Sequence, residues 1–255
     1  MSGKKEREKR REERLRQESE AEVGERRKRL LQLGGGVALV AVVVLVAFIV
    51  ISQNQGSGTS GGDTELSDVG LVSEQLRGIP QKGTVLGDSR SRTTLIEYGD
   101  LQCPICKEYS EEVLPQIISG PVRDGEATID FRNFTIISQQ SVPAGAAALA
   151  AGEQGSGWNF IELFYRNQGE ERSGYVTDEF LTAIAKGAGV PNLAKWNSDR
   201  HSQRLLNEVS RTTEQAENYG FSGTPSFVVK GPNGTNPLGT PGSAESIETA
   251  IHEGG

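Results

Sequence analysis

The feature that most constrains the fold of this chain is a pair of cysteines, Cys103 and Cys106, separated by two residues. They are the only cysteines among 255 residues. Residues 92–98 are rich in β-branched and apolar side chains and predict a strand. Residues 107–118 have apolar side chains at helical spacing and predict a helix. We therefore expect Cys103 where a strand leads into a helix, with Pro104 suited to the first helical turn.

This position favours chemistry at Cys103. Unpaired N–H groups and the helix dipole stabilise an anion at a helix N-terminus, so Cys103 should ionise more readily than a free cysteine, whose pKa is about 8.5. Cys106 is one turn further into the helix, where we expect it to be more buried and able to form a disulfide with Cys103. A loop this short stabilises a fold little. The pair is therefore interpreted as a redox-active disulfide, with no other cofactor.

The charge of the chain is unevenly distributed. Residues 1–51 contain 12 basic and 8 acidic side chains, whereas the rest of the chain contains 15 basic and 26 acidic ones. The first part is therefore positively charged and the second is strongly negative. Residues 1–29 alternate basic residues with Glu, which dilutes the positive field, so we interpret them as a solvated cytoplasmic arm that does not bind nucleic acid.

An apolar run without charges, residues 33–51, follows this arm. A helix needs roughly 20 apolar residues to cross a bilayer, so residues 30–51 are predicted to form a single transmembrane helix. A cleaved signal peptide is the alternative, but the run exceeds the usual apolar length of about 7–15 residues and no clear cleavage site follows it. The basic residues 26–29 predict a cytoplasmic N-terminus and an extracytoplasmic C-terminal domain at the cell membrane.

The rest of the chain is predicted to be a linker and one domain. Gly and Ser dominate residues 52–65, which indicates a flexible linker. Residues 66–255 are long enough for a single core. Within them, residues 127–134 predict a second strand, which makes a parallel βαβ unit with the first strand and the cysteine-bearing helix. Residues 141–219 are predicted to be an all-helical insertion, and residues 224–230 a late strand that begins right after a proline.

Smaller elements are predicted around this unit. We expect a short helix at residues 69–76 and a turn-rich segment at residues 78–83. Pro115 is expected to kink the cysteine-bearing helix, and the Gly-Pro pair at residues 120–121 to end it. A helix is expected at residues 242–252.

Two segments, residues 98–106 (YGDLQCPIC) and residues 223–228 (GTPSFV), resemble motifs of the thioredoxin superfamily. Within that superfamily, they are most similar to the DsbA-like branch, which has a helical insertion. The resemblance covers roughly residues 78–252. A lone C-x-x-C is a weak signal, but here a predicted strand precedes it, a helix follows it, and a Thr-Pro pair precedes a late strand. The resemblance implies an α/β, thioredoxin-like fold and a thiol:disulfide oxidoreductase.

The resemblance also implies a mechanism of dithiol–disulfide exchange. Cys103 would be the nucleophile that forms a mixed disulfide with a client protein, and Cys106 would be the resolving cysteine. Glu97, six residues before Cys103, matches the family's buried acidic residue and would relay a proton to or from Cys106. The alternative for Glu97 is a strand residue that faces water. Strand alternation alone does not decide whether Glu97 is buried or faces water.

Client binding is implied for four residues. Pro225 matches the family's cis-proline, which faces the cysteine pair, and the backbone of Thr224 would pair with an extended client peptide. Pro104 and Ile105, between the cysteines, complete this set. Strongly oxidising members of the branch carry His at the position of Ile105. Isoleucine donates no hydrogen bond to a thiolate, so we expect a less oxidising pair here.

A zinc site and other functions of the same fold are the alternatives to this prediction. Zinc would need His201 and His252 beside the cysteines, but these spacings match no zinc pattern, so no metal is expected. Because a fold does not fix a function, an extracytoplasmic reductase or isomerase and a non-catalytic binding or chaperone module are alternatives. The main prediction is a membrane-anchored enzyme that forms disulfides in exported client proteins. By resemblance, a quinone-linked membrane protein would reoxidise it.

Overall fold

The computed structural model of the protein describes residues 65–240 and 242–254. These residues belong to one compact unit, Asp63–Gly255. The predicted cytoplasmic arm and transmembrane helix, and nearly all of the predicted linker, lie outside the described residues. Within the described part, none of the helices combines the length and the apolar character that a membrane span requires.

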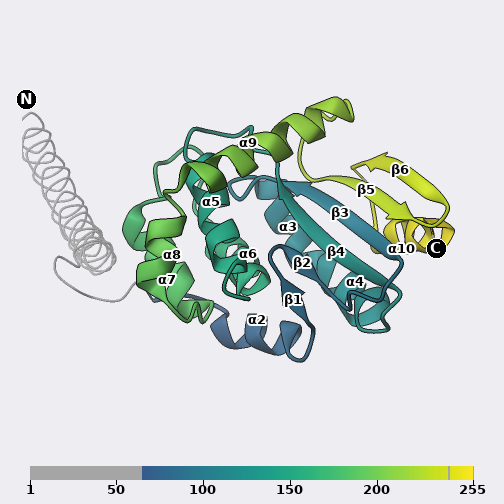
Figure 1. The fold of residues 1–255 in the computed structure, drawn as a ribbon, viewed down its shortest axis with the longest axis horizontal. Coiled ribbons are helices and arrows are strands. Elements are labelled where there is room, and N and C mark those ends of the chain that lie inside the picture. Colours follow the sequence, from purple (N-terminus) through teal and green to yellow (C-terminus); the bar gives the residue numbers. More distant parts are fainter. Residues whose placement is uncertain (1–64, 241, 255) are drawn as a thin grey trace, which may run out of the picture. The chain divides into compact units, whose positions relative to one another are not determined.

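A six-stranded sheet in the order β1-β2-β4-β3-β5-β6 forms the centre of this unit (Figure 1). Strands β3 and β4 pair in parallel, so the predicted βαβ unit is confirmed. The other neighbours pair antiparallel. The strands are β1 Gln81–Lys82, β2 Val85–Leu86, β3 Thr93–Gly99, β4 Ala127–Asn133, β5 Ser226–Gly231 and β6 Gly234–Gly239.

Strand β3 lies in the middle of the sheet, and both of its faces are covered. Leu95 belongs to the main core, whereas Ile96 and Tyr98 belong to a smaller cluster on the other face that includes Ala216 of helix α9 (Gln203–Asn218). Glu97 alternates with these residues and is only 1% exposed. Because neither face of β3 is open to water, a polar side chain on this strand is buried whichever way it points.

The helical insertion predicted between β4 and β5 is confirmed. Helices α5 to α8 lie to one side of the sheet, and α9 contacts both α5 and β4 (Figure 1). Four large aromatic side chains of the insertion lie in the core, since Trp158, Phe160, Phe164 and Trp196 are at most 1% exposed. The helices are α5 Ser141–Gly152, α6 Gly157–Arg166, α7 Asp178–Gly187, α8 Leu193–Asp199 and α9 Gln203–Asn218.

The cysteine-bearing helix is divided into α3 Pro104–Glu112, α4 Leu114–Ile117 and a π-helical turn, η1 Ile118–Val122. The break between α3 and α4 lies just before Pro115, which confirms the predicted kink. The predicted end at residues 120–121 is confirmed in part, because the regular helix breaks at Gly120 and only an irregular turn continues to Val122. Gly120 leaves the helical region with φ −99° and ψ −105°, and the Arg123 N–H bonds the Ile118 carbonyl at 3.2 Å. This wider bond bypasses Pro121, which has no N–H to donate.

Two helices complete the described fold. Helix α2 Val69–Leu76 confirms the helix predicted at residues 69–76, and α10 Ala244–Gly254 corresponds to the one predicted at residues 242–252. The segment predicted as turn-rich, residues 78–83, also contains strand β1. This strand has two residues, too few to show a strand's period of two, and it exists because it pairs with β2.

Candidate active site

Strand β3 leads the chain directly to the cysteine pair. Cys103 is the N-cap of α3 and has an extended backbone, with φ −76° and ψ 122°. Its carbonyl accepts a helical hydrogen bond from the Lys107 N–H at 3.1 Å. Pro104 occupies the first helical turn, where its missing N–H is not needed. The sulfur of Cys103 therefore lies at the end of a helix whose first N–H groups have no backbone partner.

The two thiols differ in burial. Cys103 is 4% exposed and Cys106 is completely buried, whereas Ile105 between them is 52% exposed. Both cysteines are free thiols in this structure. This burial order agrees with the sequence-based prediction that Cys106 is the inner member of the pair.

The thiols also differ in acid strength. The hydrogen bond from the Cys106 thiol is the largest cause that lowers the pKa of Cys103, which falls to about 6. The side chain of Thr224 and the backbone N–H groups of Cys106 and Ile105 add to this effect. Burial, together with the neighbouring Cys103, raises the pKa of Cys106 well above its usual value. Near neutral pH, Cys103 is therefore a thiolate and Cys106 keeps its proton.

The start of β5 faces this pair. The Thr224–Pro225 peptide bond is cis, which is the geometry that the family resemblance implies. When it is protonated, the Cys103 thiol donates to the Thr224 carbonyl at 3.4 Å. Pro225 is buried, and Ser226 begins the strand. The structure thus brings together the cysteines and the Thr-Pro pair, which are more than a hundred residues apart in the sequence.

Glu97 lies in the interior beneath the cysteines. Its partners in register on the neighbouring strands are Phe131 and Phe227, and its Oε2 atom has no hydrogen-bond partner among the described residues. Burial, and then the Glu162 carboxyl group, raise the pKa of Glu97 well above its usual value. A charge on Glu97 in turn raises the pKa of Cys106. The two groups are therefore close enough to interact electrostatically.

Asp100 holds the loop between β3 and α3, a role that the sequence analysis missed. Its side chain is completely buried. One oxygen accepts from the Gln102 N–H, and the other accepts from the N–H groups of Ile136 and Ile137, each at 2.9 Å. Asp100 thereby ties the cysteine loop to the segment that follows β4. The only local signal is its place directly after a strand, where Asp commonly bonds backbone N–H groups.

The helical insertion supplies further contacts to this loop. At the end of α6, the Gln168 side chain donates to the carbonyl oxygens of Leu101 at 2.7 Å and of Cys103 at 3.1 Å. The Tyr165 hydroxyl donates to the Asp100 carbonyl at 3.3 Å. These contacts position the backbone of Cys103.

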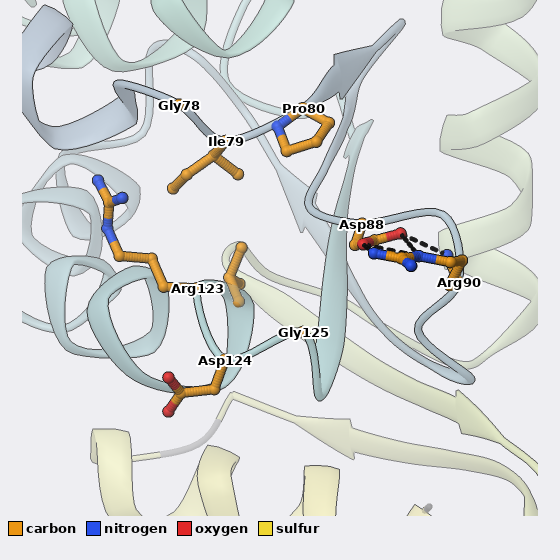
Figure 2. A pocket seen from close by; sticks show the side chains of 9 residues that line it. Gly78, Ile79, Pro80, Asp88, Arg90, Arg123, Asp124 and Gly125 are labelled. Carbon is orange, nitrogen blue, oxygen red and sulfur yellow. Dashed lines mark hydrogen bonds and ion pairs between the residues drawn. The ribbon is translucent and has the colours of Figure 1, made fainter.

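A pocket of about 640 Å³ lies away from the cysteine pair (Figure 2). Three charged side chains that line it, those of Asp88, Arg90 and Arg123, have partners within the fold. Arg90 donates to both carboxylate oxygens of Asp88 at 3.0 Å, and Arg123 donates to the backbone carbonyls of Gln75 and Arg77. None of the predicted site residues lines this pocket. Nor does the described part of the chain hold a group of three His, Cys, Asp or Glu side chains placed to bind a metal ion.

A dithiol at a helix N-terminus, opposite a cis-proline that opens a strand, defines a thioredoxin-like redox site. The model of a family described as Thioredoxin matches residues 80–252. The chain belongs to the thioredoxin family.

The chain is also similar to proteins whose names refer to disulfide formation. The "Probable disulfide bond formation protein D" of Bacillus cereus is 29% identical over 156 residues, which cover 60% of this chain and 71% of that protein. "Disulfide bond formation protein D" of Bacillus subtilis is 26% identical over 149 residues, 57% of this chain and 66% of that protein. The crystal structure of oxidised BdbD from Bacillus subtilis has a TM-score of 0.59 at 19% identity and covers 69% of this chain and 97% of that one. This protein is a DsbA-like thiol:disulfide oxidoreductase whose C-x-x-C pair is Cys103 and Cys106.

Proposed function

We propose that this protein donates disulfide bonds to proteins exported from the cytoplasm. The observation that carries the proposal is the contrast in acid strength between Cys103 and Cys106. A stabilised Cys103 thiolate stabilises the reduced protein, and a stable reduced form makes the disulfide form a better oxidant. The client leaves with a new disulfide, and this protein is left with two thiols.

Exchange proceeds in two steps. A client thiolate attacks the Cys103 sulfur, a mixed disulfide forms, and the Cys103–Cys106 bond breaks with its electron pair on Cys106. A second client thiolate then attacks the client sulfur and releases the Cys103 thiolate, which is a good leaving group because its pKa is low. Glu97 relays the proton that Cys106 takes up. Its burial and its electrostatic interaction with Cys106 support this role.

A client peptide binds in an extended conformation along the Thr224 backbone, in the manner of an added strand. The 3.4 Å contact between the Cys103 thiol and the Thr224 carbonyl supports this mode, because a peptide that pairs there lies next to the nucleophile. Pro225 and Pro104 shape the surface on either side. Ile105, which is 52% exposed, offers an apolar contact to the client.

The enzyme acts outside the cytoplasm. Residues 1–29 form the cytoplasmic arm, residues 30–51 the membrane anchor, residues 52–65 the linker and residues 66–255 the catalytic domain. The positive charge next to the apolar run supports this orientation. A quinone-linked membrane protein reoxidises the reduced pair, since each disulfide donated leaves two electrons on Cys103 and Cys106.

The reduction potential of the purified full-length protein tests the direction of electron flow. The protein is equilibrated in glutathione buffers of graded ratio, and free thiols are trapped and counted. We expect a value of about −120 to −200 mV, the range of known oxidants and isomerases. A value of about −270 mV, as in thioredoxin, would instead indicate a reductase.

Single-cysteine variants complete this test. With a client that contains a disulfide, the Cys103 thiolate of Cys106→Ala is expected to attack that bond, release one client thiolate and remain trapped as a mixed disulfide, whereas Cys103→Ala is expected to trap none. If the Cys103–Cys106 disulfide of the wild-type protein resists reduction, the proposed catalytic function is contradicted and a non-catalytic binding module is favoured.

A further inference from the structure

A second buried carboxyl group, that of Glu162 on α6, lies near Glu97 and has no part in the exchange steps proposed so far. Its side chain is completely buried. It comes from the helical insertion, whereas Glu97 comes from the central strand. Two carboxyl groups in one interior rarely ionise together, because burial and the like charge both oppose the second ionisation.

Ser110 links Glu162 to the helix that carries the cysteines. The Ser110 hydroxyl donates to Glu162 Oε1 at 3.0 Å. Ser110 follows Cys106 by four residues on α3, so the two side chains lie on the same helix face, about 5–6 Å apart at their Cβ atoms. Glu162 therefore contacts the residue that lies one helical turn after the inner cysteine.

Tyr109 occupies the same interior. Its ring centroid lies 4.9 Å from that of Phe227, which is the cross-strand partner of Glu97. The Tyr109 hydroxyl is buried without a hydrogen-bond partner in the described part of the chain. Burial raises its pKa well above the usual value, and charges on Glu97, Glu162 and Cys106 raise it further. One phenol thus interacts with all three ionisable groups.

The two carboxyl groups differ in how well each could hold a negative charge. Glu162 accepts from Ser110 and from the Gln75 amide of α2, the latter at 3.5 Å. Burial is the main influence on Glu162 and raises its pKa to about 7, while Arg166 opposes the rise and Glu111 adds to it.

Within the described part of the chain, Glu97 lacks hydrogen-bond donors of this kind at its Oε2 atom. Its neighbours in register are Phe131 and Phe227. A single negative charge shared by the pair is therefore more stable on Glu162.

We propose that Glu162 is a positioning residue that carries the one negative charge of this carboxyl pair, so that Glu97 keeps the proton it gives to Cys106. This inference rests on the proposed disulfide-donating function. When a client thiolate attacks Cys103, the S–S bond to Cys106 breaks and its electron pair stays on Cys106. Glu97 then transfers its proton to that sulfur. The carboxylate left on Glu97 lies beside the charged Glu162, which favours its reprotonation by solvent.

Glu162→Gln in the full-length protein tests this proposal. The substitution keeps the side-chain volume, and the amide oxygen can still accept from Ser110, but no charge remains. The disulfide form of each protein is mixed with one thiol-containing peptide, and single-turnover rates are measured from pH 5 to pH 9. Without the neighbouring charge, Glu97 should lose its proton at lower pH. We expect the ratio of the variant's rate to the wild-type rate to fall about tenfold between pH 6 and pH 8, which corresponds to a shift of about one pKa unit.

Three further proteins serve as controls. Glu112→Gln makes the same chemical change on the exposed face of α3 and should leave the pH profile unchanged. In a Glu97→Gln background, adding Glu162→Gln should have no further pH-dependent effect, because the proton donor is already absent. Ser110→Ala removes a donor from the Glu162 carboxylate and should change the profile in the same direction by a smaller amount.

The outcomes separate this proposal from the proposed function. If the wild-type protein donates disulfides but Glu162→Gln leaves the profile unchanged, the role of Glu162 is refuted while the function stands. An equal effect of Glu162→Gln with and without Glu97 would also refute it, since Glu162 would then act by another route. If the wild-type protein donates no disulfide at any pH, the proposed function itself fails.

Discussion

The two thiols of the site are three residues apart in the sequence, but their environments have opposite effects on a thiolate. Cys103 is at the helix N-terminus, where hydrogen-bond donors converge on its sulfur, whereas Cys106 is completely buried one turn later. Donors stabilise a thiolate and burial destabilises one. The difference between the pKa values of the two thiols therefore follows from helix geometry, and the residues between the cysteines change how large this difference is.

Ile105→His is predicted to make the pair more oxidising. Histidine at this position can donate a hydrogen bond to the Cys103 thiolate, which isoleucine cannot. We expect the pKa of Cys103 to fall by about one unit and the reduction potential to rise by about 30 mV, since both changes correspond to about 1.4 kcal/mol. Thiolate absorbance as a function of pH and glutathione equilibration measure the two quantities.

Ile105→Leu is the matched control, because it keeps the apolar character and size of the side chain. Both the pKa and the potential should stay at their wild-type values. Equal shifts in the His and Leu variants would show that packing, and not a donor, controls the thiolate.

Residues that belong to short motifs could be recognised from the sequence. Cys103, Pro104 and Pro225 each have neighbours that mark their place. Glu97 could not be assigned in this way, because its burial depends on helices that cover both faces of β3. Glu162 was missed although it interrupts an apolar run, since only packing shows that α6 is buried on nearly every side.

At the level of elements, the loop between β3 and α3 is held from outside itself. Asp100 ties it to the segment after β4, and Gln168 ties it to the insertion. These hydrogen bonds hold the loop that leads into α3, and the Ile105 and Cys106 N–H groups at the start of α3 lower the pKa of Cys103. The sequence predicted the strand and the helix on either side of the loop, but long-range bonds of this kind leave no periodic signal.

Asp100→Asn is predicted to loosen this loop. The carboxylate accepts three backbone N–H groups on two oxygens, whereas an amide has only one oxygen to offer. A buried donor left without a partner costs about 1–3 kcal/mol, so the free energy of unfolding should fall by about 2 kcal/mol. Urea unfolding followed by tryptophan fluorescence measures it, because both tryptophans of the chain, Trp158 and Trp196, are buried in the domain.

Asp124→Asn provides the comparison, since Asp124 is exposed and the chemical change is the same. Its free energy of unfolding should stay within about 0.5 kcal/mol of the wild-type value. The pKa of Cys103 should rise in Asp100→Asn alone. An Asp100→Asn protein as stable as the wild type would contradict the proposed role of this side chain.

On the scale of the whole molecule, the redox state of one bond is coupled to the stability of the domain. The pKa of Cys103 is lowered to about 6 in the folded reduced protein, against about 8.5 in an unfolded chain. A lowered pKa stabilises the fold at high pH, and this contribution is lost as the pH falls through the folded value. The disulfide form has no such thiolate.

The reduced protein is therefore predicted to gain stability relative to the oxidised protein between pH 6 and pH 8. The difference between their free energies of unfolding should change by about 2 kcal/mol in favour of the reduced form over this range. Urea unfolding of both forms at several pH values measures it. Reduced Cys103→Ala should show no such gain, and a gain of equal size in that variant would assign the effect to another group.

Most of the topology of the domain could be predicted from the sequence. The parallel pair, the helical insertion and the late strand after Pro225 have clear local patterns, and the family motifs connect them. The places of β1 and β2 could not be predicted, because each has two residues and depends on its neighbours: β1 pairs with β2, and β2 pairs with β4.

Helix α6 of the insertion contributes to the redox site as well as to the core. The same helix carries Glu162, which accepts from Ser110 of the cysteine-bearing helix, and is followed by Gln168, which donates to the Cys103 carbonyl. A version of this protein cut back to the bare thioredoxin fold would keep both sulfurs and the cis-proline but would lose these contacts. If the proposed role of Glu162 holds, a minimal enzyme engineered from this chain has to retain α6.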